Sequence, residues 1–206
     1  MSTADLRQDP YNLIITGVGG QGNVLASRMV GDMLSRQGFD ITIGETFGAS
    51  QGGGCVMSHL RVSKEGECSP QIPLGKAHLV LSLEPSEALR VLKDYGNPEV
   101  KVVTNMRPVR SIKVISGEET YPEPEKFKAW FKESTKEAWL LDTTDAATRL
   151  GNPIFGNVML VGALAEVGDL PLGKEVFEEV VRVRMPESKV AVNLEAYDIG
   201  RKMMGT

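Results

Sequence analysis

Short apolar runs alternate along the chain with stretches whose apolar residues recur every three or four positions. Tyr11–Thr16 is apolar almost throughout, which is typical of a strand buried on both faces. Residues 23–37 place their apolar side chains on one face at helical spacing, and Gly38 follows as a C-cap. With a further strand expected over 39–43, the pattern predicts a β-α-β unit at the start of the chain.

The rest of the chain continues this alternation. Further strands are expected at 55–62, 68–72, 78–83, 100–104 and 139–142, with a short one within 107–121. Helices are expected at 84–92, 123–136, 143–150, 155–166, 174–184 and 188–203. The turn residues between the first two of these strands predict a hairpin. The whole order predicts an α/β fold: a Rossmann-like, mostly parallel sheet with helices on both faces and a β-hairpin insertion.

Three of these helices carry more specific expectations. The helix over 123–136 is rich in charge and is expected to be exposed. The helix over 155–166 consists mainly of small apolar residues, which predicts a closely packed core helix. Ser188 is well placed as the N-cap of the last helix.

Composition narrows the class of protein. The 206 residues suffice for one core, so 11–206 are expected to form a single domain behind a disordered leader over 1–10. A net charge of −4 and a pI near 5.4 argue against binding to nucleic acid or to an anionic membrane. No run approaches the ~20 apolar residues of a membrane span, and the polar start lacks the apolar core of a signal peptide, which favours a cytoplasmic protein.

A glycine-rich turn follows the first expected strand. Residues 17–22 fit the G-x-G-x-x-G pattern, and the first glycine of such a turn permits the tight bend. The second lets a ligand approach the backbone, and free N–H groups at the helix start favour an anion. Pattern alone indicates a nicotinamide or flavin dinucleotide, for which Glu45 could bind the ribose. The candidates for facing a ligand or a partner chain are Gly17, Gly19, Gly20, Gln21 and Gly22.

A second glycine-rich segment follows the second expected strand. Residues 48–54 hold four glycines, which is costly in folding entropy, at the strand end where open α/β sheets bind ligands. A tight hairpin entry would also explain the glycines, but we favour a surface where the backbone lies close to a ligand or a partner chain. The dinucleotide pattern does not require this second loop, which weakens that interpretation. The candidates here are Glu45, Thr46, Phe47, Gly48, Gln51, Gly53 and Gly54.

The side chains most often used in catalysis are sparse. His59 and His78 lie in or beside strands with no second ligand at metal spacing, so a structural role is favoured. Cys55 and Cys68 are too few for an iron–sulfur cluster or a zinc site and are expected to be free thiols with packing roles. The chain therefore offers no convincing nucleophile, acid–base pair or redox centre.

Four segments, taken together and in order, resemble a known family. They are YNLIITGVGGQG, ETFGASQGGGCVMSHLRV, QIPLGKAHLVLSLEPSEALR and GNVMLVGALAEVG. The chain is similar over most of its length to the gamma domain of 2-oxoacid:ferredoxin oxidoreductases. As a free subunit of this size, it is most similar to the beta subunits of indolepyruvate ferredoxin oxidoreductases.

This resemblance implies a mechanism spread over two chains. A large partner subunit would hold thiamine diphosphate, Mg and iron–sulfur clusters, oxidise an aryl 2-oxoacid to an acyl-CoA with coenzyme A as co-substrate, and pass electrons to ferredoxin. The small subunit would bind none of these cofactors alone and be inactive alone. The two glycine loops, with Asn157, would face the partner or the ligand. Family members commonly carry arginine after the loop glutamine, whereas Gly52 follows Gln51 here, which puts an anion contact at that position in doubt.

Two other functions stay open at this stage. One is a self-sufficient NAD(P)-dependent oxidoreductase, supported by the first glycine loop and Glu45. The other is a non-catalytic scaffold domain. The resemblance favours the enzyme subunit over both.

Overall fold

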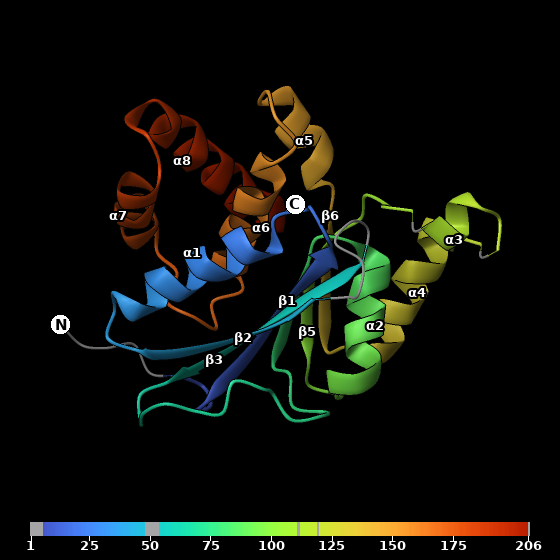
Figure 1. Cartoon of the computed structure of the whole chain (residues 1–206), viewed down its shortest axis with the longest axis horizontal. Coiled ribbons are helices and arrows are strands. Elements are labelled where there is room, and N and C mark those ends of the chain that lie inside the picture. Colours follow the sequence, from blue (N-terminus) through green and yellow to red (C-terminus); the bar gives the residue numbers. More distant parts are fainter. Residues whose placement is uncertain (1–5, 48–53, 111, 119, 206) are drawn as a thin grey trace.

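A six-stranded sheet with strand order β2-β3-β1-β4-β5-β6 forms the centre of the protein. The structure, a computed structural model, describes residues 6–47, 54–110, 112–118 and 120–205 (Figure 1). β3 is antiparallel to both of its neighbours and the remaining pairs are parallel, so five of the six strands run in one direction. The expected α/β fold with a mostly parallel sheet is confirmed. The strands are β1 (Tyr11–Val18), β2 (Asp40–Phe47), β3 (Cys55–Ser63), β4 (Leu79–Ser82), β5 (Lys101–Asn105) and β6 (Glu137–Leu141).

The hairpin lies at a different place from the one expected. β3 pairs with β2 on one side and β1 on the other, so neither of its edges is free for a further strand. Cys68–Ile72, expected to be its hairpin partner, is irregular and covers one face of the β2-β3 hairpin. A Cβ on Gly44 would meet Pro70 there, and the Ile72 N–H donates to His59 Nδ1 at 3.2 Å.

Helices cover both faces of the sheet, as expected (Figure 1). α1 and α6 pack on one face with α7 and α8 outside them, and α2 and α4 pack on the other. No helix in the described part of the chain is long and apolar enough to cross a bilayer. The helices are α1 (Asn23–Ser35), α2 (Pro85–Tyr95), α3 (Ile112–Ile115), α4 (Pro124–Ser134), α5 (Thr143–Arg149), α6 (Phe155–Glu166), α7 (Lys174–Arg184) and α8 (Glu187–Lys202), followed by a 3-10 turn, Met203–Gly205.

Two local expectations are wrong, and a third is confirmed with one exception. The segment 107–121 contains the short helix α3 where a short strand was expected. α4 is exposed along most of its surface, as expected, but Phe127 and Phe131, four residues apart, share one helix face and are fully buried. Ser188 is not an N-cap, because α8 already begins at Glu187 behind Pro186 and no side chain caps it.

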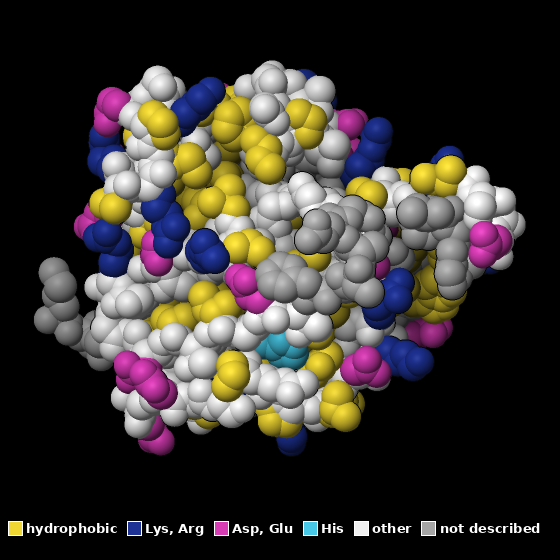
Figure 2. All heavy atoms as spheres, viewed as in Figure 1, with side chains coloured by type: hydrophobic (Ala, Val, Ile, Leu, Met, Phe, Trp, Pro, Cys, Tyr) yellow, Lys and Arg dark blue, Asp and Glu magenta, His cyan; other side chains and the backbone are white. Residues whose placement is uncertain are grey.

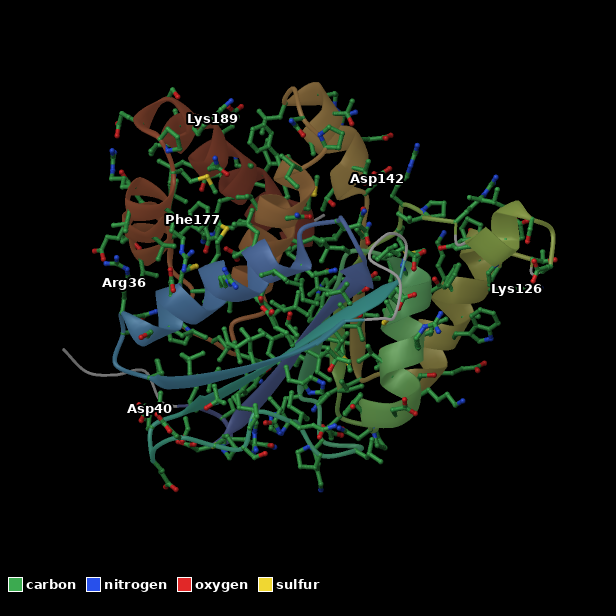
Figure 3. All side chains as sticks on the ribbon, viewed as in Figure 1. Arg36, Asp40, Lys126, Asp142, Phe177 and Lys189 are labelled. Carbon is green, nitrogen blue, oxygen red and sulfur yellow. The ribbon has the colours of Figure 1, made fainter. Side chains whose placement is uncertain are left out.

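α6 is the core helix that its composition predicted, and it packs unusually closely on α8. A Cβ on Gly162 would clash with the backbone carbonyl of Tyr197, and one on Gly200 with that of Met159. The outer layer closes over this pair: Phe177 points inward from α7 (Figure 3) and stacks on the Tyr197 ring with centroids 4.1 Å apart. The two glycines thus set the distance between the helices.

Candidate functional site

The sheet reverses its direction of winding between β1 and β4. From β1 the chain crosses by α1 towards β2, and from β4 it crosses by α2, on the other face, towards β5. Open α/β sheets bind ligands in the crevice at the carboxyl ends of the strands that flank such a reversal. The first glycine loop lies at this place.

Backbone geometry explains two of the four glycines of the first loop. Gly20 has φ +93° and Gly22 has φ +88°, both in the left-handed region that other residues rarely adopt. Gly22 is also the residue before α1, and no side chain caps that helix. The Gly19 N–H donates to the carbonyl of Gly54 at 2.7 Å, so the first glycine loop contacts the end of the second, as their shared strand edge predicts.

Gln21 holds the loop in place with both ends of its amide. Its Oε1 accepts from the Val18 N–H at 2.7 Å, and its Nε2 donates to the Leu83 carbonyl at 3.2 Å. Val18 ends β1 and Leu83 follows β4, so one side chain spans the reversal point. Gln21 therefore positions the loop and has its polar groups satisfied inside the protein.

Asn157 is the one candidate far along the chain, and the structure brings it to the same loop. It lies in the first turn of α6, and its Nδ2 donates to the Gln21 carbonyl at 2.5 Å. A Cβ on Gly22 would clash with the Asn157 amide. The third glycine of the motif thus makes room for Asn157, in addition to its usual role in packing the helix on its strand.

A cavity of about 220 Å³ opens beside this loop. Asn105, at the end of β5, organises its floor: Nδ2 donates to Thr144 Oγ1 at 2.9 Å, and Oδ1 accepts from the Thr143 N–H at 3.1 Å. Arg107 lies two residues further on and lines the same cavity. The sequence pattern did not single out these residues, although each lies at the end of β5 or within three residues after the end of β5 or β6. Asp142, which follows β6 and is the N-cap of α5, marks this edge in Figure 3.

A second, more polar cavity of about 450 Å³ lies between β3, α2 and the segment before α4. Glu84 is fully buried beside it and accepts hydrogen bonds from Tyr121 Oη, from Ser86 Oγ at 2.5 Å and from the Glu87 N–H at 3.0 Å. Burial is the main cause, and the Glu84 carboxylate the second, of a pKa of Tyr121 that lies far above its ordinary value. These contacts fix the start of α2.

Cys55 lines the same cavity as a half-buried thiol. Burial, followed by the nearby Glu87 carboxylate, raises the pKa of Cys55 to about 12. Glu87 is itself buried and pairs with Arg90, 3.3 Å away. A thiol in this setting is protonated at neutral pH and is a poor nucleophile. Cys55 and Cys68 are both free thiols, and each is partly buried where a buried side chain was expected.

The candidates on β2 lie further from the first loop than a dinucleotide site requires. Glu45 pairs with Ser58 of β3, and β3 separates β2 from β1. Two strand spacings amount to roughly 10 Å, whereas the ribose-binding acid of the dinucleotide motif lies on the strand next to β1. Thr46 is exposed on the same edge strand. The side chain of Phe47, and the residues Gly48, Gln51 and Gly53, lie outside the described residues.

The two histidines have roles in folding. His59 Nδ1 accepts from the Ile72 N–H, and His78 Nδ1 accepts from the Asn12 N–H at 2.9 Å. Burial lowers the pKa of both rings below the ordinary value. Within the described parts of the chain, no three His, Cys, Asp or Glu side chains converge as metal ligands would.

Comparison with known proteins places the chain in a family. The model of the pyruvate ferredoxin/flavodoxin oxidoreductase family matches residues 12–203. The chain belongs to this family. A member from Pyrococcus horikoshii, indolepyruvate oxidoreductase subunit IorB, is 38% identical over 193 residues, which cover 93% of this chain and 95% of the relative. IorB from Thermococcus kodakarensis is 36% identical with the same coverage. The family inferred from the four sequence segments is confirmed.

Solved structures of this oxidoreductase family share the fold. A keto/oxoacid ferredoxin oxidoreductase gamma subunit from Geobacter sulfurreducens superimposes with a TM-score of 0.66 at 19% identity, over 94% of this chain and 98% of that one. The 2-oxoglutarate:ferredoxin oxidoreductase of Magnetococcus marinus gives a TM-score of 0.74 at 19% identity. There the match covers 97% of this chain but 32% of the larger chain. The same fold thus occurs both as a separate subunit and as part of a longer oxidoreductase chain.

Proposed function

We propose that this chain is the small subunit of a 2-oxoacid:ferredoxin oxidoreductase that acts on an aryl 2-oxoacid, with indolepyruvate as the leading substrate. The observation that carries the proposal is the near end-to-end match to proteins named indolepyruvate oxidoreductase subunit IorB. Both chains are covered by more than nine tenths, so the similarity is not confined to a shared motif. In the complete enzyme the 2-oxoacid is decarboxylated and oxidised to an acyl-CoA, and the electrons pass to ferredoxin.

The redox cofactors of such an enzyme would be held by a large partner subunit. An iron–sulfur cluster ordinarily takes four cysteine thiolates, and this chain contains two cysteines in all. One of them, Cys55, keeps its proton at neutral pH. The residues present therefore do not fit a cluster, which supports a partner that carries the clusters together with thiamine diphosphate and Mg.

The carboxyl edge of the sheet is the proposed face towards the partner and towards coenzyme A. The hydrogen bond from Gly19 to Gly54 brings the two glycine loops together at this edge. Asn157 joins them through Gln21. Gln21 and Asn157 hold the loop from within, so we assign the direct contact to the backbone of Gly19 and Gly20 and to the second loop.

Co-expression with the large subunit tests the proposal. We expect a brown complex that reduces ferredoxin or a viologen dye with indolepyruvate and coenzyme A, while this chain alone is colourless and inactive. A large subunit that turns over equally fast without this chain would contradict the proposal and leave a scaffold role.

An NADH titration of the chain, monitored by fluorescence, tests the remaining alternative, a self-sufficient NAD(P)-dependent oxidoreductase. The position of β3 between β1 and β2 leads us to expect no saturable binding at millimolar NADH. Saturable binding would instead support a self-sufficient dehydrogenase.

A further inference from the structure

The cavity beside the first glycine loop carries an arginine that the protein itself does not neutralise. The chain is acidic overall, and most of its arginines are used in pairs, such as Arg184 with Asp32 and Arg201 with Glu166. Among the described residues, Arg107 has no ion-pair or hydrogen-bond partner, yet it lines the cavity. An unpaired guanidinium at the rim of a cavity is suited to a carboxylate or a phosphate.

Two almost completely buried side chains in the same cavity also keep unused hydrogen-bonding groups. Thr143 is 1% exposed and Asn157 is 7% exposed. Thr143 Oγ1 and Asn157 Oδ1 make no hydrogen bond to any described residue, although the Thr143 N–H and Asn157 Nδ2 do. Thr144 Oγ1 accepts from Asn105 and keeps its own hydrogen to donate. Neither Thr143 Oγ1 nor Asn157 Oδ1 is sealed from solvent, so both are open to the cavity and can bond to an occupant with polar groups of its own.

Apolar side chains form the rest of the wall. Leu83, Val109 and Leu160 line the cavity, and Ile154 stands at its mouth with 41% of its surface exposed. A volume of about 220 Å³ is below the roughly 300–1,000 Å³ of sites for drug-sized ligands. The occupant is therefore smaller than a dinucleotide and carries an apolar group beside its charge.

We infer that this cavity binds a small amphipathic carboxylic acid. The carboxylate lies against Arg107 and the hydroxyls of Thr143 and Thr144, and the apolar group packs between Leu83, Val109 and Ile154. A carboxylate fits better than a phosphate because the walls are mainly apolar and one cation neutralises one charge. The inference goes beyond the proposed function, in which the reacting 2-oxoacid and its cofactors are assigned to the partner subunit.

Calorimetric titration of the full chain tests the inference with indole-3-acetate and phenylacetate, which cannot be decarboxylated by this route. We expect saturable 1:1 binding and at least tenfold weaker binding of the uncharged indole-3-acetamide. Arg107→Gln should weaken the binding of both acids by about tenfold or more, because a charge-assisted hydrogen bond is lost. Thr143→Val, which keeps the shape of the side chain, should weaken it as well.

Arg110→Gln is the matched control, because Arg110 lies three residues away in the same segment and does not line the cavity. It should bind the acids as the unaltered chain does, and circular dichroism should show equal folding of all variants. Absence of saturable binding to the unaltered chain, or equal losses in the two arginine variants, would overturn the inference.

A third outcome would assign the cavity to the partner. If Arg107→Gln leaves acid binding unchanged but weakens the complex with the large subunit, the cavity takes a partner's carboxylate and the inference is wrong. Acid binding is measured on this chain alone, whereas the proposed function depends on turnover of the complex. Either can therefore fail without the other.

Discussion

Gln21 illustrates how a residue at a proposed binding edge can act by holding the backbone in place. Its amide satisfies the Val18 N–H and the Leu83 carbonyl, and its own carbonyl accepts from Asn157. The bonds to Leu83 and Asn157 join segments that are far apart in sequence, so they fix the loop relative to β4 and α6. The motif singled out Gln21 as a candidate, but the inward direction of its side chain was not predictable, because Leu83 and Asn157 come from later parts of the chain.

Cys55 gives a prediction at the residue scale. With its pKa raised to about 12, little thiolate is present at pH 8, and the higher intrinsic reactivity of a basic thiolate offsets only part of this loss. In a Cys68→Ala variant, we expect iodoacetamide to alkylate Cys55 at least tenfold more slowly in the folded chain than in the unfolded chain. Mass spectrometry measures the extent of alkylation. The rate should rise with pH up to pH 10 without a plateau, and urea should restore the unfolded rate. A rate that levels off between about pH 9 and pH 10 would show that the thiol ionises with the ordinary pKa of about 8.5.

At the scale of elements, the hydrophobic periodicity predicted well whether a segment is a helix or a strand, but it predicted poorly which elements pack or pair with one another. α6 and α7 have the bounds that their patterns predicted. Cys68–Ile72 is apolar enough to suggest a strand, but β3 already has two partners, and strand pairing depends on which edges the rest of the chain leaves free. α4 is a second example of poorly predicted packing. Many of its residues are charged, so the sequence did not reveal the apolar face of two residues that α2 and the sheet cover.

The α6–α8 contact gives a prediction at this scale. Gly162→Ala should lower the free energy of unfolding by about 3 kcal/mol, because its Cβ would overlap a backbone carbonyl that a rotamer change cannot move. Gly31→Ala is the matched control within a helix, since its Cβ would meet the flexible end of Ile43. Alanine also favours a helix by up to about 1 kcal/mol over glycine, which offsets the cost of moving the Ile43 side chain. The free energy of unfolding of Gly31→Ala should therefore be close to that of the unaltered chain. Urea unfolding measures both, and equal effects would contradict the close-approach argument.

At the scale of the whole molecule, the candidate site depends on the strand order. The sequence located both glycine loops, and the structure brings the first loop to the end of the second and to Asn157. The sequence did not show that Arg107 and Thr143 belong to the same cavity, because this depends on β5 and β6 lying beside β4 in this order. The space-filling view adds a feature that periodicity did not predict: apolar side chains gather in the hollow between α1 and the outer helices α7 and α8 (Figure 2).

The opposite edge of the sheet is held by one buried carboxylate. Asp169, between α6 and α7, is 8% exposed; Oδ2 accepts from Tyr11 Oη at 2.9 Å, and Oδ1 pairs with Lys101 at 2.9 Å and Arg7 at 3.1 Å. These partners come from β1, β5 and the segment before β1, part of the expected leader. Burial, followed by Asp169, raises the pKa of Tyr11, so the phenol stays a donor at neutral pH. One side chain thus joins four separate parts of the chain.

Asp169→Ala should therefore destabilise the whole molecule by about 3–5 kcal/mol, because it leaves the buried Lys101 ammonium uncompensated. Asp169→Ala combined with Lys101→Met should recover much of this loss, since the second change removes the unpaired charge. Glu125→Ala, which breaks an exposed pair with Lys128, is the control and should cost less than about 1 kcal/mol. Urea unfolding at pH 7 measures all three. If the double variant is no more stable than Asp169→Ala, the loss comes from the Tyr11 and Arg7 contacts, and the carboxylate acts mainly by anchoring the start of the chain.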